Sequence, residues 1–306
     1  MTDKPETVSL YQFFQRFPNE ETARQYFENN RWAGEVSCPH CGSLSVAPVK
    51  NMKPMPYRCR DCRQHFSVRT GTVLAESRLP LHKWLMAIYM MTTARKGIPS
   101  TQMARELGIT QKSAWFLAQR IRETWMVISE DDMGPDVQVD ETFIGGKERN
   151  KHANKRTRHG TDTKTAVVGI IENNGRVRAE PISNLSKAYL QRFVRANARE
   201  GATVVTDAFR SYAGLSDAYT HKTVNHSVGE YVRDQAHTNG IESFWALLKR
   251  GHYGIFHSMS GNHLHRYVNE FAFRHNTKQS GTMGFIEATV GRMVGKRLTY
   301  KELINA

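Results

Sequence analysis

The sequence predicts a mixed α+β or α/β protein with an N-terminal binding region followed by a mixed-sheet domain. Three observations lead to this prediction: four cysteines within 25 positions, a long helical stretch after them, and a switch to period-two apolar patterning near residue 137. A chain of 306 residues has room for about two domains. Its hydrophobic content of 39% is enough for packed cores and too high for a disordered polycation.

The charge of the chain predicts a polyanionic partner. Lys and Arg number 43 and Asp and Glu 29, so the net charge is 43 − 29 = +14. Nucleic acid is the usual partner of such a chain, although a merely basic surface is an alternative. No apolar run approaches the ~18–20 residues that span a bilayer, and the N-terminus lacks a secretory pattern. We therefore expect no membrane partner and a cytoplasmic protein.

The cysteines form two C-x2-C pairs, Cys38 with Cys41 and Cys59 with Cys62, separated by 17 residues. This spacing is typical of two knuckles that place four thiolates tetrahedrally around Zn²⁺. Two disulfides are the alternative, which a reducing cytosol disfavours. Residues 46–57 resemble a β-ribbon arm, with Pro54 and Pro56 at its turn. The sequence thus predicts a structural zinc ribbon.

Helices are expected on both sides of this ribbon. Residues 9–32 are typical of two short amphipathic helices, and residues 80–128 are helical throughout. Within the second stretch, Ser100 caps a short helix, Gly108 makes a turn, and another helix begins near Thr110. This order predicts a helix-turn-helix, for which an ordinary helical hairpin is the alternative. Its groove-facing residues would be Gln111, Lys112 and Ser113.

Past residue 128 the pattern changes to strands. Residues 137–144, 165–173 and 176–182 read as an antiparallel meander, followed by a helix over 186–199, a strand over 202–206, a strand over 221–226 and a helix over 238–250. This order is that of a ribonuclease-H-like fold, with a mixed sheet and helices on both faces.

Three acids occupy consistent places in that order. Asp140 lies within the first strand, Asp207 closes the fourth, and Glu242 lies one turn into the late helix. The first and fourth strands are neighbours in the predicted sheet, so Asp140 and Asp207 can meet at its centre with Glu242 over them. Clustered carboxylates suit two Mg²⁺ or Mn²⁺ ions. The alternative is that acids end strands by chance, or that Asp207 caps the following helix.

Residues 139–147 (VDETFIGGK), 206–212 (TDAFRSY) and 237–250 (HTNGIESFWALLKR) resemble the catalytic blocks of bacterial insertion-sequence transposases of the DDE type, with an N-terminal zinc ribbon and an integrase-like core. The resemblance extends over nearly the whole chain. It implies that Asp140 and Asp207 are metal ligands. Members of this group can carry Asn or His in place of the third acid, so Glu242 and Asn239 are both candidates. Residues three apart share a helix face, and we expect Glu242 to be the ligand and Asn239 to line the site.

Basic stretches predict where DNA is held. The insertion over residues 147–159 carries six Lys or Arg and one Glu. It leaves the strand that bears Asp140, so we expect a phosphate-gripping loop that orders on DNA, in preference to a solvated mobile loop. Two further cations follow the third block. The expected contacts are Lys147, Arg149, Lys151, Lys155, Arg156, Arg158, Lys249 and Arg250.

The function expected from this resemblance is DNA transposition. The ribbon and helix-turn-helix would bind the terminal inverted repeats of an element, and the acids would hydrolyse a phosphodiester and join the freed 3′-hydroxyl to target DNA. Joining two ends in concert requires a homodimer or higher oligomer. Alternatives are a zinc-ribbon regulator without catalysis and a nuclease of the same fold. The expected divisions are 1–75 (helices and ribbon), 76–130 (helix-turn-helix), 131–290 (catalytic domain) and 291–306 (basic tail).

Overall fold

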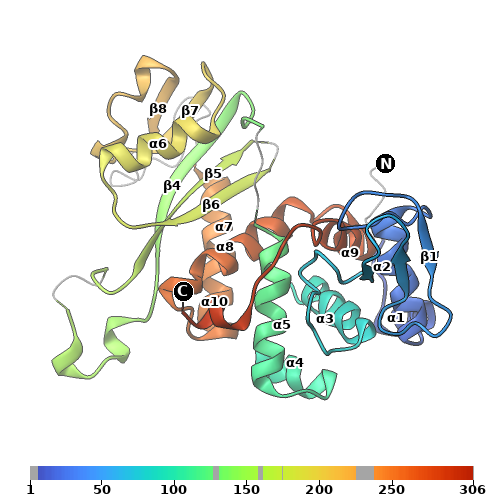
Figure 1. The fold of residues 1–306 in the computed structure, drawn as a ribbon. Helices are drawn as coiled ribbons and strands as arrows, with labels where there is room; N and C mark the ends of the chain where they lie inside the picture. The colour runs from blue at the N-terminus through green and yellow to red at the C-terminus, as the bar shows by residue number, and fades with distance from the viewer. Residues whose placement is uncertain (1–5, 127–130, 158–160, 174, 225–237, 306) are drawn as a thin grey trace. The chain divides into compact units, whose positions relative to one another are not determined.

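The computed structural model describes residues 6–126, 131–157, 161–173, 175–224 and 238–305. The chain divides into two compact units (Figure 1), the first formed by Met1–Trp125 with Thr277–Ala306 and the second by Met126–Asn276. No helix among the described residues combines the length and the apolar character needed to cross a lipid bilayer.

The first unit opens with two capped helices and a small sheet. Helix α1 (Leu10–Arg16) begins at Ser9 and helix α2 (Glu20–Trp32) at Asn19, and both N-caps form a capping box. The antiparallel sheet has the order β1 (Val46–Pro48), β2 (Tyr57–Cys59), β3 (His65–Phe66). The rings of Trp32, Tyr57 and Phe66 contact one another with centroids 5.6–6.1 Å apart. The end of α2 therefore covers one face of the ribbon.

Three helices follow: α3 (Leu81–Thr93), α4 (Ser100–Leu107) and α5 (Gln111–Thr124). Helix α4 ends at Gly108, whose φ of +59° is the left-handed conformation that a glycine adopts without strain. Thr110 then caps α5 by accepting the backbone N–H of Ser113. Two helices joined by a turn at Gly108 are thus present, with Thr110 capping the second as predicted. The prediction that Ser100 caps α4 is wrong, because Pro99 takes the N-cap position and the Ser100 hydroxyl instead accepts the Gln111 amide.

Residues 277–306 pack with the first unit. Helix α9 (Gly281–Gly291) contacts α2 and α3, and the Trp125 indole N–H donates to Thr289 Oγ1 at 3.0 Å. After α9 the chain pairs with the segment that leaves the ribbon, through an isolated bridge between Thr72 and Val294, and ends in α10 (Tyr300–Ile304). Packing thus places a boundary at residue 276. The division expected at residue 290 from the sequence stays an expectation.

The second unit is built on a five-stranded mixed sheet in the order β6-β5-β4-β7-β8 (Figure 1). Strands β4, β5 and β6 form an antiparallel meander, β7 lies parallel to β4, and β8 lies parallel to β7. This order confirms the ribonuclease-H-like prediction, including the neighbouring first and fourth strands. The strands are β4 (Asp136–Ile144), β5 (Thr165–Glu172), β6 (Val177–Ile182), β7 (Thr203–Asp207) and β8 (Thr220–Val224).

Helices cover both faces of this sheet. Helix α6 (Lys187–Asn197) packs on one face, in a core that includes Val137 and Val139 of β4. Helices α7 (Asn239–Gly251) and α8 (Gly261–Asn276) pack on the other face, in a core that includes Ile144 and Val167. Because side chains alternate along a strand, the even-numbered residues of β4 point toward α7. A π-helix (His252–Phe256) extends α7, and short 3-10 turns occupy Glu148–Asn150, Ala153–Lys155, Arg210–Tyr212 and Leu215–Asp217.

Candidate active site and metal centre

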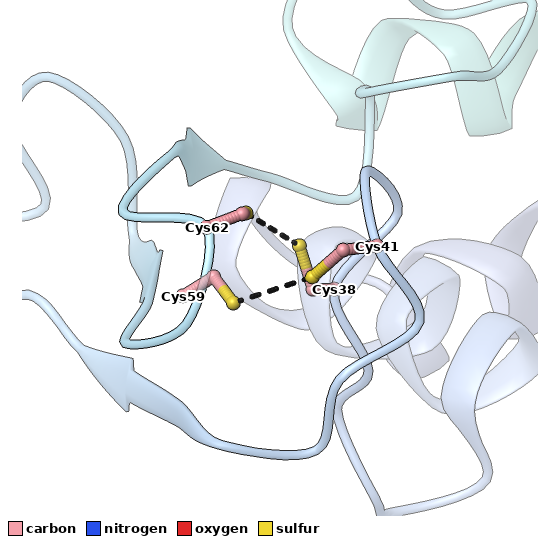
Figure 2. A group of neighbouring side chains, drawn as sticks. All are labelled: Cys38, Cys41, Cys59 and Cys62. Atoms are coloured by element: carbon pink, nitrogen blue, oxygen red, sulfur yellow. Dashed lines mark hydrogen bonds between the residues drawn. The ribbon is translucent and has the colours of Figure 1, made fainter.

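The four cysteines converge at the tips of two turns (Figure 2). Their Sγ atoms all lie within 4.8 Å of one another, and the Cys38–Cys62 and Cys41–Cys59 sulfur separations are 3.6 and 3.7 Å. Ligands about 2.3 Å from a tetrahedral zinc would lie ~3.8 Å apart. All four cysteines are free of disulfides. The donor set and its spacing therefore fit a structural Zn²⁺ ion.

Asp140 and Asp207 lie on two neighbouring parallel strands, each two residues beyond the last paired residues of β4 and β7. Gln138 of β4 pairs with Val205 of β7, and two residues further along each strand come the two aspartates. A step of two keeps a side chain on the same face, which is the α7 face for both. The register thus puts both aspartates on one face of neighbouring strands, and their meeting at the centre of the sheet stays a prediction.

The charges of the other two acids both act on Asp140. Burial is the main cause that raises the pKa of Asp140 to about 6, and the charges of Asp207 and Glu242 raise it further. Two donors oppose this shift, the backbone N–H of Glu141 and the indole N–H of Trp245. A divalent cation near these acids would relieve the repulsion between their like charges.

Helix α7 carries the two candidates for the third ligand. Glu242 is exposed and accepts the hydroxyl of Thr238 at 2.9 Å, and its charge is felt by Asp140. Asn239 is the first residue of the helix and is also exposed. Over the described residues, the cysteines are the only group of three or more potential ligands with such closely gathered donor atoms. The three acids are therefore more widely spaced than the cysteines.

A further acid, Glu141, was not foreseen from the sequence. It points to the α6 face, where the Tyr212 hydroxyl donates to its Oε2 at 2.7 Å. Burial, above all, raises the pKa of Glu141 to about 7, and the charges of Asp207 and Asp140 add to this. Glu141 and Tyr212 both lie in sequence blocks that resemble the transposase family, residues 139–147 and 206–212. Because side chains alternate along β4, Glu141 lies on the opposite face of the sheet from Asp140.

Trp245 has a polar role that the sequence did not reveal. Sequence patterning favours it as a packing residue, and it is indeed 3% exposed. Its indole N–H also donates to Asp140 Oδ2 at 3.0 Å. The ring lies over Gly169, the residue that pairs with Asp140 on the adjacent strand β5. Trp245 therefore contacts both the candidate ligand and the strand beside it.

The raised pKa of Asp140 predicts that this carboxylate lowers stability at neutral pH. Between pH about 4 and 6 the folded state binds more protons here than the unfolded state, so stability falls as the pH rises through this window. Without divalent ions, Asp140→Asn should raise the free energy of unfolding by about 1–3 kcal/mol at pH 7.5 and leave it nearly unchanged at pH 4. Urea unfolding at the two pH values measures this, and an equal effect at both would contradict it.

The basic insertion is organised around one acid. Glu148 accepts the ammonium of Lys151, the backbone N–H of Thr157 and the hydroxyl of Thr163. The ammonium of Lys151 is the first cause that lowers the pKa of Glu148 to about 2. Arg156 donates to the carbonyls of Lys151 and Arg149. The loop expected to order on DNA thus already has internal structure over its described part.

The side chains predicted to contact DNA differ in their exposure and in the partners they already have. Arg149 is exposed, Lys147 lies 4.8 Å from the ring centre of Tyr253, and Lys151 is paired with Glu148. Lys249 and Arg250 occupy the last turn of α7, where Lys249 is half-buried and Arg250 exposed. The side chain of Lys155 and the whole of Arg158 lie outside the described residues.

The three residues predicted to contact DNA in the α4–α5 pair lie in the first turn of α5. Gln111 and Lys112 are exposed, and Ser113 is half-buried. The amide of Gln111 donates to Ser100 Oγ at 2.8 Å, and the hydroxyl of Thr110 donates to Ser113 Oγ at 2.9 Å. The ammonium of Lys112 lies 4.5 Å from the ring centre of Tyr300 in α10. Residues of α4 and α10 therefore flank the start of α5.

Comparison with known proteins agrees with this arrangement. Residues 133–276 match the family model of the ISXO2-like transposase domain, and residues 18–65 match that of the transposase zinc-ribbon domain. The chain is a DNA transposase of the DDE type. More particularly, it is an insertion-sequence transposase that has an N-terminal zinc ribbon and an ISXO2-like catalytic domain.

The chain is similar to one curated protein and, more weakly, to solved structures. A protein of Halobacterium salinarum, described as an uncharacterized protein in transposable element ISH50, is 29% identical over 248 residues, which are 76% of this chain and 83% of that protein. The crystal structure of a pre-cleavage Mos1 transpososome covers 69% of this chain and 79% of its own, with 12% identity and a TM-score of 0.26. The Mos1 strand transfer complex covers 70% and 79%, with 13% identity and a TM-score of 0.27. Likeness at this level transfers no residue or contact.

Proposed function

We propose that this transposase cuts and joins DNA at a divalent-metal site held by Asp140, Asp207 and Glu242, with Asn239 lining it. The observation that carries this proposal is the placement of two aspartates at equivalent positions of neighbouring central strands, on the face covered by the helix of Glu242. The preference for Glu242 over Asn239 is supported by its charge, which acts on Asp140. Mg²⁺ or Mn²⁺, in a pair, would activate the attacking oxygen and offset charge on the leaving oxygen.

The proposed reaction has two steps on one site. Hydrolysis breaks a P–O bond at the element end and leaves a 3′-hydroxyl. That hydroxyl then attacks a target phosphorus, so that one P–O bond forms as another breaks. In both steps the protein's carboxylates position the reacting groups, while Trp245 holds the Asp140 carboxyl in one orientation. Coupled joining of two ends supports a homodimer or higher oligomer on DNA.

Oligonucleotides that carry the element ends test this proposal. With Mg²⁺ or Mn²⁺, the transposase should produce both cut ends and joined products on a target duplex. Cutting without joining would identify a nuclease, and specific binding without cutting would identify a regulator. Either of these outcomes would overturn the proposed strand transfer.

We further propose that the first unit binds the inverted repeats and that the basic insertion of the second unit grips phosphates. Lys and Arg that neutralise phosphates release counterions, which makes binding salt-dependent. Among the described residues, the Arg149 side chain forms no hydrogen bond or ion pair, and its exposed charge is available to DNA.

Arg149→Ala should therefore change salt dependence more than Lys151→Ala. If Arg149→Ala removes one phosphate contact, the plot of the logarithm of the DNA-binding constant against the logarithm of the salt concentration should become less steep by about 0.9. A smaller change is expected for Lys151, because Glu148 already offsets its charge. Filter binding over a range of salt concentrations measures both slopes. A larger change in slope for Lys151→Ala than for Arg149→Ala would contradict the proposal that Arg149 is the side chain available to DNA.

A further inference from the structure

A side chain of strand β4 caps the N-terminus of helix α7, although the two are far apart in sequence. The side-chain oxygen of Gln138 accepts the backbone N–H groups of Gly240 and Ile241 at 3.0 and 3.2 Å, across 102 and 103 residues of sequence. These groups belong to the first turn of α7, where backbone donors lack helical partners. Thr238 makes no side-chain cap. A Cβ at Gly240 would lie 2.8 Å from the Gln138 oxygen, so this approach needs a glycine.

The same strand holds α7 again one turn later. Trp245 donates to Asp140, and a Cβ at Gly169 would come within 2.6 Å of the indole ring. Only a glycine at the position paired with Asp140 leaves room for the ring. The two polar contacts on α7 arise from residues 138 and 140, which project from the same face of β4. Together they fix both the rotation of α7 and its position along the strand.

We propose that Gln138, Gly169 and Trp245 are positioning residues that hold α7 against β4, so that Glu242 is directed at the aspartates before any ion binds. This inference rests on the proposed function, because it requires that Asp140 ligates a metal. Trp245 acts both on the helix and on the ligand itself, since its N–H fixes the rotation of the Asp140 carboxyl. Outer partners of this kind tune metal affinity through the ligands they orient.

Ion binding by the full-length, zinc-loaded protein tests the inference. The free Mn²⁺ signal in electron paramagnetic resonance gives the dissociation constant without any turnover. Trp245→Phe keeps a ring over Gly169 but removes the N–H, and should weaken Mn²⁺ binding about tenfold. Trp125→Phe is the matched control, because it removes an indole N–H bond of the same 3.0 Å length in the first unit. It should leave Mn²⁺ binding unchanged.

The outcomes separate this inference from the proposed function. If Asp140→Ala binds Mn²⁺ as tightly as the wild type, the proposed metal site is wrong, and the positioning role is wrong with it. If Asp140→Ala loses binding while Trp245→Phe does not, only the positioning inference is wrong. Should Trp245→Phe fail to fold, Gln138→Met provides the test. Methionine has a side chain of similar length but lacks the oxygen that accepts the α7 N–H groups, so this variant should weaken Mn²⁺ binding several-fold. Unchanged binding in this variant would overturn the inference.

Discussion

Asp140→Asn and Asp207→Asn are each expected to reduce strand transfer at least about a thousandfold, because metal ions supply several kcal/mol of charge stabilisation and each factor of ten corresponds to about 1.4 kcal/mol. The two side chains occupy equivalent positions on neighbouring strands, so neither can replace the other. Asparagine keeps the size and one oxygen acceptor but removes the charge that holds a divalent ion. Joined product formed from labelled element ends measures the effect.

Asp217→Asn provides the matched control, because it makes the same chemical change at an exposed acid in a short turn after β7. It should retain wild-type strand transfer. Glu242→Gln should resemble the aspartate variants, while Asn239→Ala should lose much less. Strand transfer within tenfold of the wild type for Asp140→Asn or Asp207→Asn would contradict the site. A severe loss for Asn239→Ala combined with a mild one for Glu242→Gln would make Asn239 the third ligand.

The second large effect is expected from loss of zinc. The ribbon sheet has strands of three, three and two residues, which is too little to be stable by itself. Structural zinc supplies about 10–16 kcal/mol in zinc-finger peptides, and that energy is folding energy. Cys59→Ser, at a fully buried ligand position, should therefore unfold residues 38–66 and abolish specific binding of the element ends.

Limited trypsin digestion measures this unfolding directly. Arg58, Arg60 and Arg63 are exposed side chains on or beside the folded ribbon, and their peptide bonds should become cleavable when zinc is removed. Ser43→Ala, at a residue that is not a ligand, is the control and should keep one zinc per chain. A Cys59→Ser protein that resists trypsin and still binds element ends would show that the metal does not hold the ribbon together.

Local patterns were sufficient to predict most of the fold. The period of the apolar residues predicted the strands, and the order of those strands predicted that β4 and β7 are neighbours, which the sheet confirms. The spacing of the cysteines predicted their convergence. The shared face of Asp140 and Asp207 follows from the same reasoning, because parity along a strand is readable from sequence. Their roles in catalysis stay predictions.

Contacts between distant segments could not be read in this way. Gln138 looks like an ordinary strand residue until Gly240 lies against it, and Gly169 looks replaceable until Trp245 covers it. The contact that Glu141 makes could not be predicted without knowing which helix packs on its face of the sheet. The insertion was expected to order on DNA, but Glu148 already gives its described part structure through polar contacts that no hydrophobic pattern reveals.

The first unit combines residues 1–125 with residues 277–306, so the whole sheet unit is inserted between its two parts. During synthesis the chain is folded from its N-terminus as it emerges. The sheet unit is therefore complete in sequence before α9 reaches its place against α2 and α3. Ribosomal synthesis therefore completes the sheet unit before the unit that holds the zinc ribbon. A gene copy interrupted shortly after codon 276 would encode a complete sheet unit without a complete first unit.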